Sequence, residues 1–194
     1  MASPHILIYH PRRDLLLADN PAFHEISKSL QQSLHPFTHL LPLYVFPAQQ
    51  LEVSGFLSSP DARLPFPEAR SQVGGFWRCG LYRVKFLVES VWDLKISLER
   101  VGSGLVIRAG TIGRVINDLL EGFKKGDGEV VGICMTSEEG VEEKREENDV
   151  RDVAEVEGID FRLLRDEKYF IDEYVLSSTS KELTIDNPQS RPAP

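Results

Sequence analysis

The chain has 194 residues, a net charge of −8 at pH 7 and 41% hydrophobic residues. This length and composition suit one domain with a full hydrophobic core, and no apolar run reaches the roughly 20 residues that span a bilayer. The acidic balance argues against a free-standing nucleic-acid binder, which normally carries a basic face. The only two cysteines, Cys79 and Cys134, stand far apart, which predicts no disulfide framework and favours a reducing compartment, cytoplasmic or nuclear.

The first third of the chain predicts a strand, a helix and a second strand. The apolar run His5–Tyr9 is bounded by prolines, which is typical of a short strand, and it follows the N-terminus without the basic leader of a signal peptide. Asn20 is a good helix cap, and the proline after it suits the first position of a helix over Pro21–Leu34. The second strand is predicted at Leu40–Phe46, where Pro42 favours an edge or an early position.

The middle of the chain combines a long loop with the clearest helix. Residues Gln49–Gly75 are rich in Pro, Ser and Gly, and so long a loop in a compact domain is usually functional or disordered. Within Phe76–Gly110, apolar residues recur at steps of three and four, which predicts one buried helical stripe. The stripe consists of Val84, Leu87, Val88, Val91, Leu94 and Leu98. Gly102 and Gly104 end this helix, and Leu105–Arg108 is the third predicted strand.

The last third alternates in the same way. Thr111 can cap a helix, and Val130–Met135 is apolar enough for a strand that is buried on both faces. The helix between them is expected to point Ile112, Val115, Ile116, Leu119 and Leu120 inward. A charged helix over Val141–Glu155 and a fifth strand at Ile159–Leu164 complete the pattern. From there the pattern fades, and we expect a disordered tail over 166–194.

Five strands with mostly helical connections predict an α/β fold, a doubly wound five-stranded parallel sheet in a single domain over residues 1–165. We expect the Rossmann-like strand order 3-2-1-4-5, which places a switch point between the first and fourth strands. Ligands of open α/β sheets bind beyond the carboxyl ends of the strands at such a point. The predicted cleft is lined by Arg12, Arg13, Asp14, Thr136, Ser137 and Glu138. Alternatively, the two arginines form local ion pairs that shape the loop.

Two motifs in this pattern are specific enough to suggest a family. One is RRDLLLADNPAF at Arg12–Phe23, which matches a run Arg-x-Asp-Leu-Arg-Leu-x-Asp-Asn except that Leu16 replaces the second arginine. The other lies within Phe76–Gly110 and matches Gly-x-x-Arg-x-x-Phe-Leu-x-Glu-Ser-x-x-x-Leu. Its matching residues are Gly80, Arg83, Phe86, Leu87, Glu89, Ser90 and Leu94. In this order and spacing, both motifs resemble the N-terminal domain of the photolyase–cryptochrome family, closest to the DASH cryptochromes, and the resemblance covers roughly residues 4–165.

The resemblance implies a domain that binds a light-harvesting antenna, either a folate of the methenyltetrahydrofolate type or a flavin. In full-length relatives a large helical domain follows and holds the FAD that serves blue-light-dependent DNA repair or photoreception. Nothing in this sequence resembles that domain. We therefore expect a truncated relative, or one whose FAD domain is a helical partner in trans, and no catalysis by this chain alone. Trp77 and Trp92 are expected to serve packing.

The resemblance also implies one antenna ligand. In DASH relatives a glutamate early in the helix after the fourth strand contacts the folate, in a local pattern Ser-Glu-Glu-x-x-x-Glu-Lys that matches Ser137–Lys144 and carries the role to Glu143. A carboxylate can accept paired hydrogen bonds from the ring N–H and amino group of a pterin. The other acidic residues of this helix are expected to form a solvated charged face. These are Glu142, Glu146, Glu147, Asp149 and Asp152.

Other functions are less well supported by the sequence. No Cys, His or carboxylate set has the spacing of a zinc site, so we predict no metal, and there is no nucleophile elbow or P-loop. Two alternatives remain open: a protein-interaction module without a chromophore, and a small nucleotide-binding α/β protein unrelated to light. We expect no membrane contact and no direct DNA binding by this chain alone.

Overall fold

The computed structural model describes residues 3–31, 37–53, 59, 61–71 and 73–164. The sequence predictions for the tail over 166–194 and for the end of the first helix beyond residue 31 lie outside these ranges. None of the described helices combines the length and the apolar character needed to cross a lipid bilayer.

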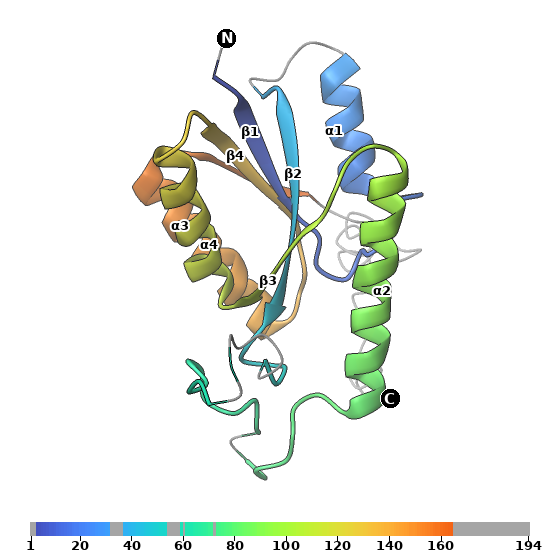
Figure 1. Ribbon diagram of the computed structural model, residues 1–194, viewed down its shortest axis with the longest axis vertical. Helices are drawn as coiled ribbons and strands as arrows, with labels where there is room; N and C mark the ends of the chain where they lie inside the picture. Colours follow the sequence, from blue (N-terminus) through green and yellow to red (C-terminus); the bar gives the residue numbers. More distant parts are fainter. Residues whose placement is uncertain (1–2, 32–36, 54–58, 60, 72, 165–194) are drawn as a thin grey trace, which may run out of the picture.

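The core of the fold is one parallel sheet of five strands in the order β3-β2-β1-β4-β5, as the sequence predicted (Figure 1). The strands are β1 His5–His10, β2 His39–Pro47, β3 Val106–Gly110, β4 Glu129–Thr136 and β5 Asp160–Leu164. The strand β1 lies in the centre and pairs with β2 on one side and β4 on the other. All five carboxyl ends therefore meet at one edge of the sheet, and the chain reverses its winding direction beside β1.

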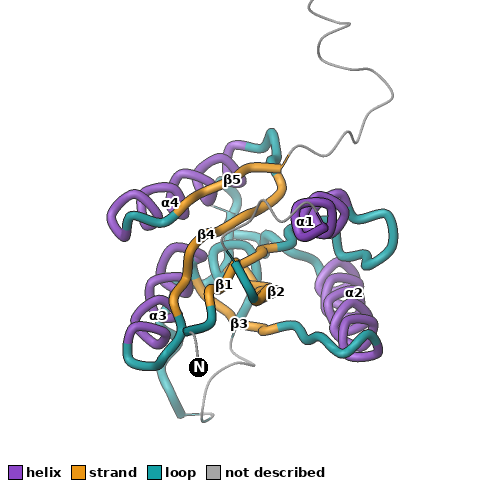
Figure 2. The backbone as a smooth tube through the Cα atoms, turned by 90° about the horizontal axis from the view of Figure 1, so that it is seen from above, coloured by secondary structure: helices purple, strands orange, loops and turns teal. Residues whose placement is uncertain are grey.

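Four helices cover the sheet on both faces (Figure 2). On one face lie α1 Pro21–Gln31 and α2 Leu81–Arg100; on the other lie α3 Ile112–Lys124 and α4 Val141–Glu157. Successive strand side chains point to opposite faces. Accordingly, Ile6 and Ile8 of β1 belong to the cluster under α3 and α4, whereas Leu7 and Tyr9 pack with α1.

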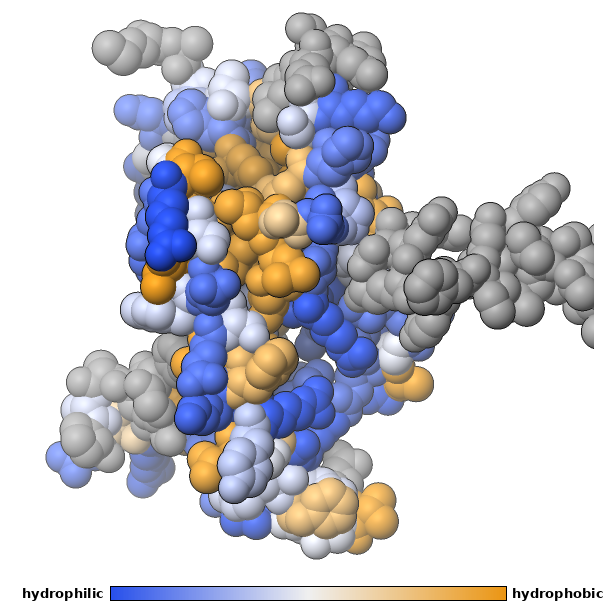
Figure 3. Space-filling view, turned by 90° about the vertical axis from the view of Figure 1, so that its right-hand side faces the viewer, coloured by the Kyte–Doolittle hydropathy of each residue, from blue (hydrophilic) through white to orange (hydrophobic). Residues whose placement is uncertain are grey.

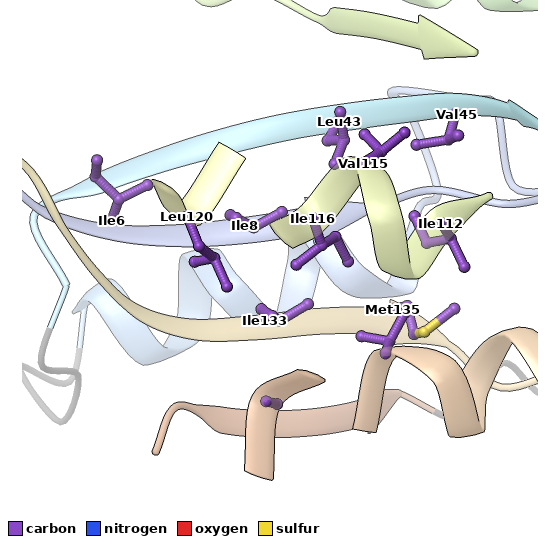
Figure 4. Close-up of a cluster of buried hydrophobic side chains, with 12 residues drawn as sticks. Ile6, Ile8, Leu43, Val45, Ile112, Val115, Ile116, Leu120, Ile133 and Met135 are labelled. Carbon is purple, nitrogen blue, oxygen red and sulfur yellow. The ribbon is translucent and has the colours of Figure 1, made fainter. Parts of the chain in front are cut away.

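Among the described residues, the largest cluster of buried hydrophobic side chains lies under α3 and α4. Ile8 of β1, Ile133 of β4 and Ile116 of α3 have no exposed surface and point toward one another (Figure 4). The helical stripe predicted for α3 is confirmed, because Ile112, Val115, Ile116 and Leu120 are buried and Leu119 is partly buried. Full burial of one such aliphatic side chain stabilises the fold by about 1.5–3 kcal/mol.

The helix α2 has the predicted position but a narrower buried stripe. Val91, Leu94 and Leu98 are buried, and Val84 and Leu87 are partly buried. The prediction for Val88 was wrong, because it is exposed. At about 100° per residue, Val88 lies about 80° from the middle of the stripe and therefore at its edge.

The two tryptophans also differ from their predicted role. Trp77 and Trp92 are each about half exposed, so they contribute less to packing than expected. The ring of Trp77 lies under the guanidinium of Arg70, with 4.0 Å between the ring centroid and Cζ. The ammonium of Lys95 lies 5.7 Å from the ring centroid of Trp92.

The helix ends follow the sequence with one exception. The Asn20 side chain accepts a hydrogen bond of 2.9 Å from the backbone N–H of Phe23, which confirms it as the cap of α1. Gly102, at φ 80°, follows the end of α2, a left-handed conformation that glycine adopts without strain. Thr111 stands at the N-cap of α3, but its side chain makes no capping hydrogen bond.

The strand β2 shows how Pro42 is accommodated. This strand lies inside the sheet, and Pro42 is its fourth residue, paired with Tyr9 of β1. Pairing with β3 begins only at Leu43. The proline therefore precedes the part of β2 that has neighbours on both sides, which agrees with the predicted early position and not with an edge strand.

Candidate functional site

A small cavity opens at the carboxyl edge of the sheet, beside the point where the winding direction reverses. Its volume is about 230 Å³. Four segments that are distant in sequence line it: the loops after β1 and β2, the beginning of α2, and the first turn of α4. The polar and charged lining residues are Arg13, Gln50, Arg78, Arg83, Glu142 and Glu143.

Beneath the cavity, Arg12 fixes α4 to the loop after β1. Its side chain is only 5% exposed, and its two terminal nitrogens lie 2.9 Å from carboxylate oxygens of Glu146 and Glu147. One of these nitrogens also donates a hydrogen bond of 2.8 Å to the backbone carbonyl of Glu143. The sequence left open whether the arginines bind a ligand or form local ion pairs. Arg12 forms the local ion pairs that shape this loop.

Glu147 corrects a prediction from the sequence. It was expected on a solvated face, yet its side chain is 2% exposed. The same oxygen that pairs with Arg12 also accepts a hydrogen bond of 2.9 Å from the backbone N–H of Glu138. A buried carboxylate persists only when it is paired and hydrogen-bonded, so Glu147 links the helix α4, the segment after β4 and the loop after β1.

Glu143 lies at the rim of the cavity in the first turn of α4. The N-cap of this helix is Gly140, so Glu143 is the third helical residue, a position from which a carboxylate can reach back to the free N–H groups. A Cβ atom at Gly140 would lie 2.8 Å from Cδ of Glu143, so the glycine leaves room for this carboxylate.

The surroundings of Glu143 stabilise the negative charge of its carboxylate. Burial alone would raise the pKa of its carboxyl group, but its own backbone N–H and the guanidinium of Arg13 outweigh this and lower the pKa below its usual value. Glu143 is therefore ionised at neutral pH. Its side chain is 14% exposed and pairs with Arg13, and Arg78 pairs with Glu142 in the same way across the cavity.

The predicted site residues fall into three groups. Arg13 and Glu143 line the cavity, whereas Arg12, Thr136 and Glu138 are buried beneath the surface. Ser137 and Asp14 are partly buried and do not line the cavity. The Ser137 hydroxyl accepts a hydrogen bond of 3.4 Å from Lys144, and the backbone carbonyl of Asp14 accepts one of 3.3 Å from the Asn20 side chain. Contact of these residues with a ligand stays a prediction.

Sequence reasoning missed the side of the cavity that comes from α2 and the long loop. Arg83 and Leu87 line the cavity from α2, Arg78 and Cys79 from the segment just before this helix, and Gln50 from the long loop. Arg83 and Leu87 are part of the second motif, which could have indicated them. Within the described residues, no group of three His, Cys, Asp or Glu side chains could hold a metal ion.

Comparison with known proteins identifies the family. The family profile described as DNA photolyase matches residues 7–178. The chain belongs to the DNA photolyase family. A mitochondrial cryptochrome DASH of Neurospora crassa is 52% identical over 171 residues, which cover 88% of this chain and 23% of that protein. A cryptochrome DASH of Gibberella zeae is 43% identical over 173 residues, covering 89% of this chain and 24% of that protein.

Solved structures of this family share the fold. A cryptochrome of Synechocystis superposes with a TM-score of 0.63 at 22% identity, over 85% of this chain and 28% of its own. A photolyase of Sulfolobus tokodaii, solved with two FAD molecules, superposes with a TM-score of 0.57 at 20% identity, over 91% of this chain and 34% of its own. The chain thus corresponds to the N-terminal region of the family and spans about a quarter of the curated relatives it matches.

Proposed function

We propose that this chain is the antenna-binding domain of a DASH-type cryptochrome or photolyase, and that the cavity beside Glu143 holds part of a reduced folate of the methenyltetrahydrofolate type. The single observation that carries the proposal is the carboxylate of Glu143 at the rim of this cavity, where it pairs with Arg13. Arg13, which now pairs with Glu143, is 61% exposed and can move into solvent. The ring N–H and amino group of a pterin can then replace the guanidinium as a paired donor.

The size and charge of the cavity suit a folate of which this chain binds only one part. Pockets that enclose a whole ligand usually measure about 300–1,000 Å³, and this cavity of about 230 Å³ is smaller. It has room for the bicyclic ring but not for the complete folate. The cations Arg13, Arg78 and Arg83 around it suit the carboxylates at the far end of a folate. The rest of the molecule needs a second wall from another domain.

The role of the chain in the whole protein follows from this arrangement. Members of the family carry FAD and antenna cofactors. A bound folate would absorb light, and this chain would contribute the residues that hold and orient it. Blue-light-dependent DNA repair or photoreception would then need the FAD-binding part of the protein, in the same polypeptide or as a separate chain, because this chain matches only about a quarter of its DASH relatives.

The test is uptake of the folate by the purified chain. We expect near-ultraviolet absorbance of bound methenyltetrahydrofolate in the wild type, and a loss of affinity of about 10- to 150-fold in Glu143→Gln, since hydrogen bonds to a charged group contribute about 1.5–3 kcal/mol. Glu139→Gln is the matched control, because Glu139 precedes the same helix, is 80% exposed and does not line the cavity. Equal affinity in both variants would contradict the assignment of Glu143.

Two further results would favour other functions. Uptake of a flavin nucleotide instead of the folate, with the same dependence on Glu143, would change the class of antenna and keep the site. A chain that takes up neither, alone or with a flavin-binding partner, would favour an interaction module without a chromophore.

The compartment is a separate proposal. We propose that the protein acts in the cytoplasm or nucleus, because its two separated cysteines suit a reducing compartment. The Neurospora crassa relative, in contrast, is named as mitochondrial. A fluorescent fusion of the native protein, imaged beside a mitochondrial marker, separates the two compartments.

A further inference from the structure

The beginning of α2 exposes an unusual number of large apolar side chains. Leu81, Tyr82 and Phe86 are 81%, 89% and 71% exposed, and we call these three residues the α2 rim. Phe76 and Trp77, in the segment that leads into the helix, are also exposed. Figure 3, which looks onto the side of the molecule where α2 lies, shows hydrophobic surface in separate patches, the largest in the upper half and smaller ones toward the lower end, where α2 begins. Exposed apolar surface on a soluble domain can mark an interaction site.

The α2 rim cannot be buried by a local rearrangement. At about 100° per residue, Tyr82 and Phe86 lie some 140–180° around the helix from Val91, which is buried against the sheet. Turning the helix to bury the rim would expose Val91, Leu94 and Leu98, at a cost of about 1.5–3 kcal/mol for each side chain. A partner outside the described structure is needed to cover the rim.

The α2 rim shares the first two turns of α2 with the wall of the candidate antenna cavity. Arg83 and Leu87, which line the cavity, follow Tyr82 and Phe86 in the sequence and lie about 100° further around the helix. A partner that packs on the rim therefore lies beside the cavity. Because the cavity is too small for a whole folate, such a partner is well placed to provide its second wall.

The relatives indicate what this partner is. The chain matches 23% and 24% of the two DASH cryptochromes, which leaves about three quarters of each polypeptide outside the matched region. In the relatives this remainder belongs to the same polypeptide as the matched region. We propose that the α2 rim is the docking surface for the flavin-binding remainder of a DASH cryptochrome, in the same polypeptide or in trans. The identity of the partner rests on the proposed function, whereas the exposure of the α2 rim is independent of that function.

The experiment measures binding between the 194-residue chain and the remainder of the Neurospora crassa relative, purified with its flavin bound. We expect the wild-type chain to form a complex. The double variant Tyr82→Ser/Phe86→Ser should bind at least about 30-fold more weakly, because truncating an aromatic anchor at an interface often costs about 2 kcal/mol or more of binding free energy. Val156→Ser is the matched control: Val156 is 85% exposed on α4, in the opposite layer. Circular dichroism confirms that each variant is folded.

The outcomes separate the possibilities. Failure of the wild-type chain to bind the flavin-loaded remainder, or equal binding by the double variant, overturns the proposal. Sedimentation of the chain alone tests whether a second copy of the chain covers the α2 rim. Self-association that the double variant abolishes would also overturn the proposal. Binding that depends on the rim without any uptake of folate supports the docking surface and rejects the antenna function, so the two proposals can fail separately.

Discussion

The two layers on either side of the sheet differ in how completely they bury their own apolar residues. Under α3 and α4, Ile8, Ile116 and Ile133 have no exposed surface. On the opposite face, α2 buries one narrow stripe and exposes Tyr82 and Phe86 on its far side. The first layer encloses its apolar side chains, whereas α2 in the second layer has one face on the sheet and one exposed face, which we propose as a docking surface. The predictions below test this contrast, from the largest expected effect to the smallest.

The largest effect is expected where α4 is fixed by a buried ion pair. Arg12→Ala should reduce the free energy of unfolding by about 3–5 kcal/mol, because it removes the buried cation that pairs with Glu146 and Glu147 and leaves the buried carboxylate of Glu147 only the longer 3.4 Å ion pair with Lys144. Urea denaturation measures this. Arg13→Ala, at an exposed neighbouring position, should cost less than about 1 kcal/mol. Similar costs for both variants would mean that the buried pair is not what holds α4.

The second prediction concerns the core under α3. Ile116→Ala should cost about 2–5 kcal/mol, because it leaves a cavity among side chains that have no exposed surface. Ile96→Ala on the partly exposed face of α2 is the comparison, and we expect a loss of about 1 kcal/mol or less there. If Ile96→Ala lowers the free energy of unfolding in urea as much as Ile116→Ala does, the two layers do not differ as described.

The third prediction is a pH dependence from His10, a buried histidine at the end of β1. Burial, partly offset by a hydrogen bond to the carbonyl of Leu43 and reinforced by the charge of Arg12, lowers the pKa of His10 from 6.5 to about 4. The unfolded chain therefore binds a proton at a higher pH than the folded chain does. Stability is lost as the pH falls from 6.5 toward 4, by about 3 kcal/mol in total.

The measurement compares unfolding free energies of the wild type and His10→Gln across this pH range. We expect the difference between the two proteins to shrink as the pH falls, because only the wild type pays the protonation cost of this histidine. His24→Gln, at an exposed position of α1, serves as the control for loss of a histidine. Parallel curves for wild type and His10→Gln would show that His10 does not titrate as its burial requires.

The smallest effect is expected at the α2 rim. Phe86→Ser should change the unfolding free energy of the isolated chain by no more than about 0.5 kcal/mol, since the ring is mostly in water. Leu94→Ala, on the buried side of the same helix, should cost about 2–5 kcal/mol. A large loss in Phe86→Ser would mean that the rim already packs within this chain, and the docking surface would lose its support.

Most of the fold could be predicted from local sequence. Alternating strand and helix patterns, with caps such as Asn20, predicted the elements and the strand order because winding rules leave few topologies for five parallel strands. The error with the largest consequence lies where burial depends on a distant partner. Glu147 looks like any other acid on a charged helix, and its burial follows only from Arg12, which lies 135 residues earlier in the chain.

The candidate site was predicted in part for the same reason. Glu143 and Arg13 were found from a motif and from the switch-point rule, and both line the cavity. Gln50 in the long loop and Arg78 in the segment before α2 were missed, because the path of irregular backbone cannot be deduced from its composition.

By itself, the sequence determined the family, the parallel sheet and the helical stripes, since these depend on periodicity and short motifs that act within a few residues. Only the tertiary structure decided which charges are buried, which side of α2 remains exposed, and that α2 and α4 meet around one cavity. Desolvation and packing arise from residues brought together over more than a hundred positions, and no local pattern contains that information.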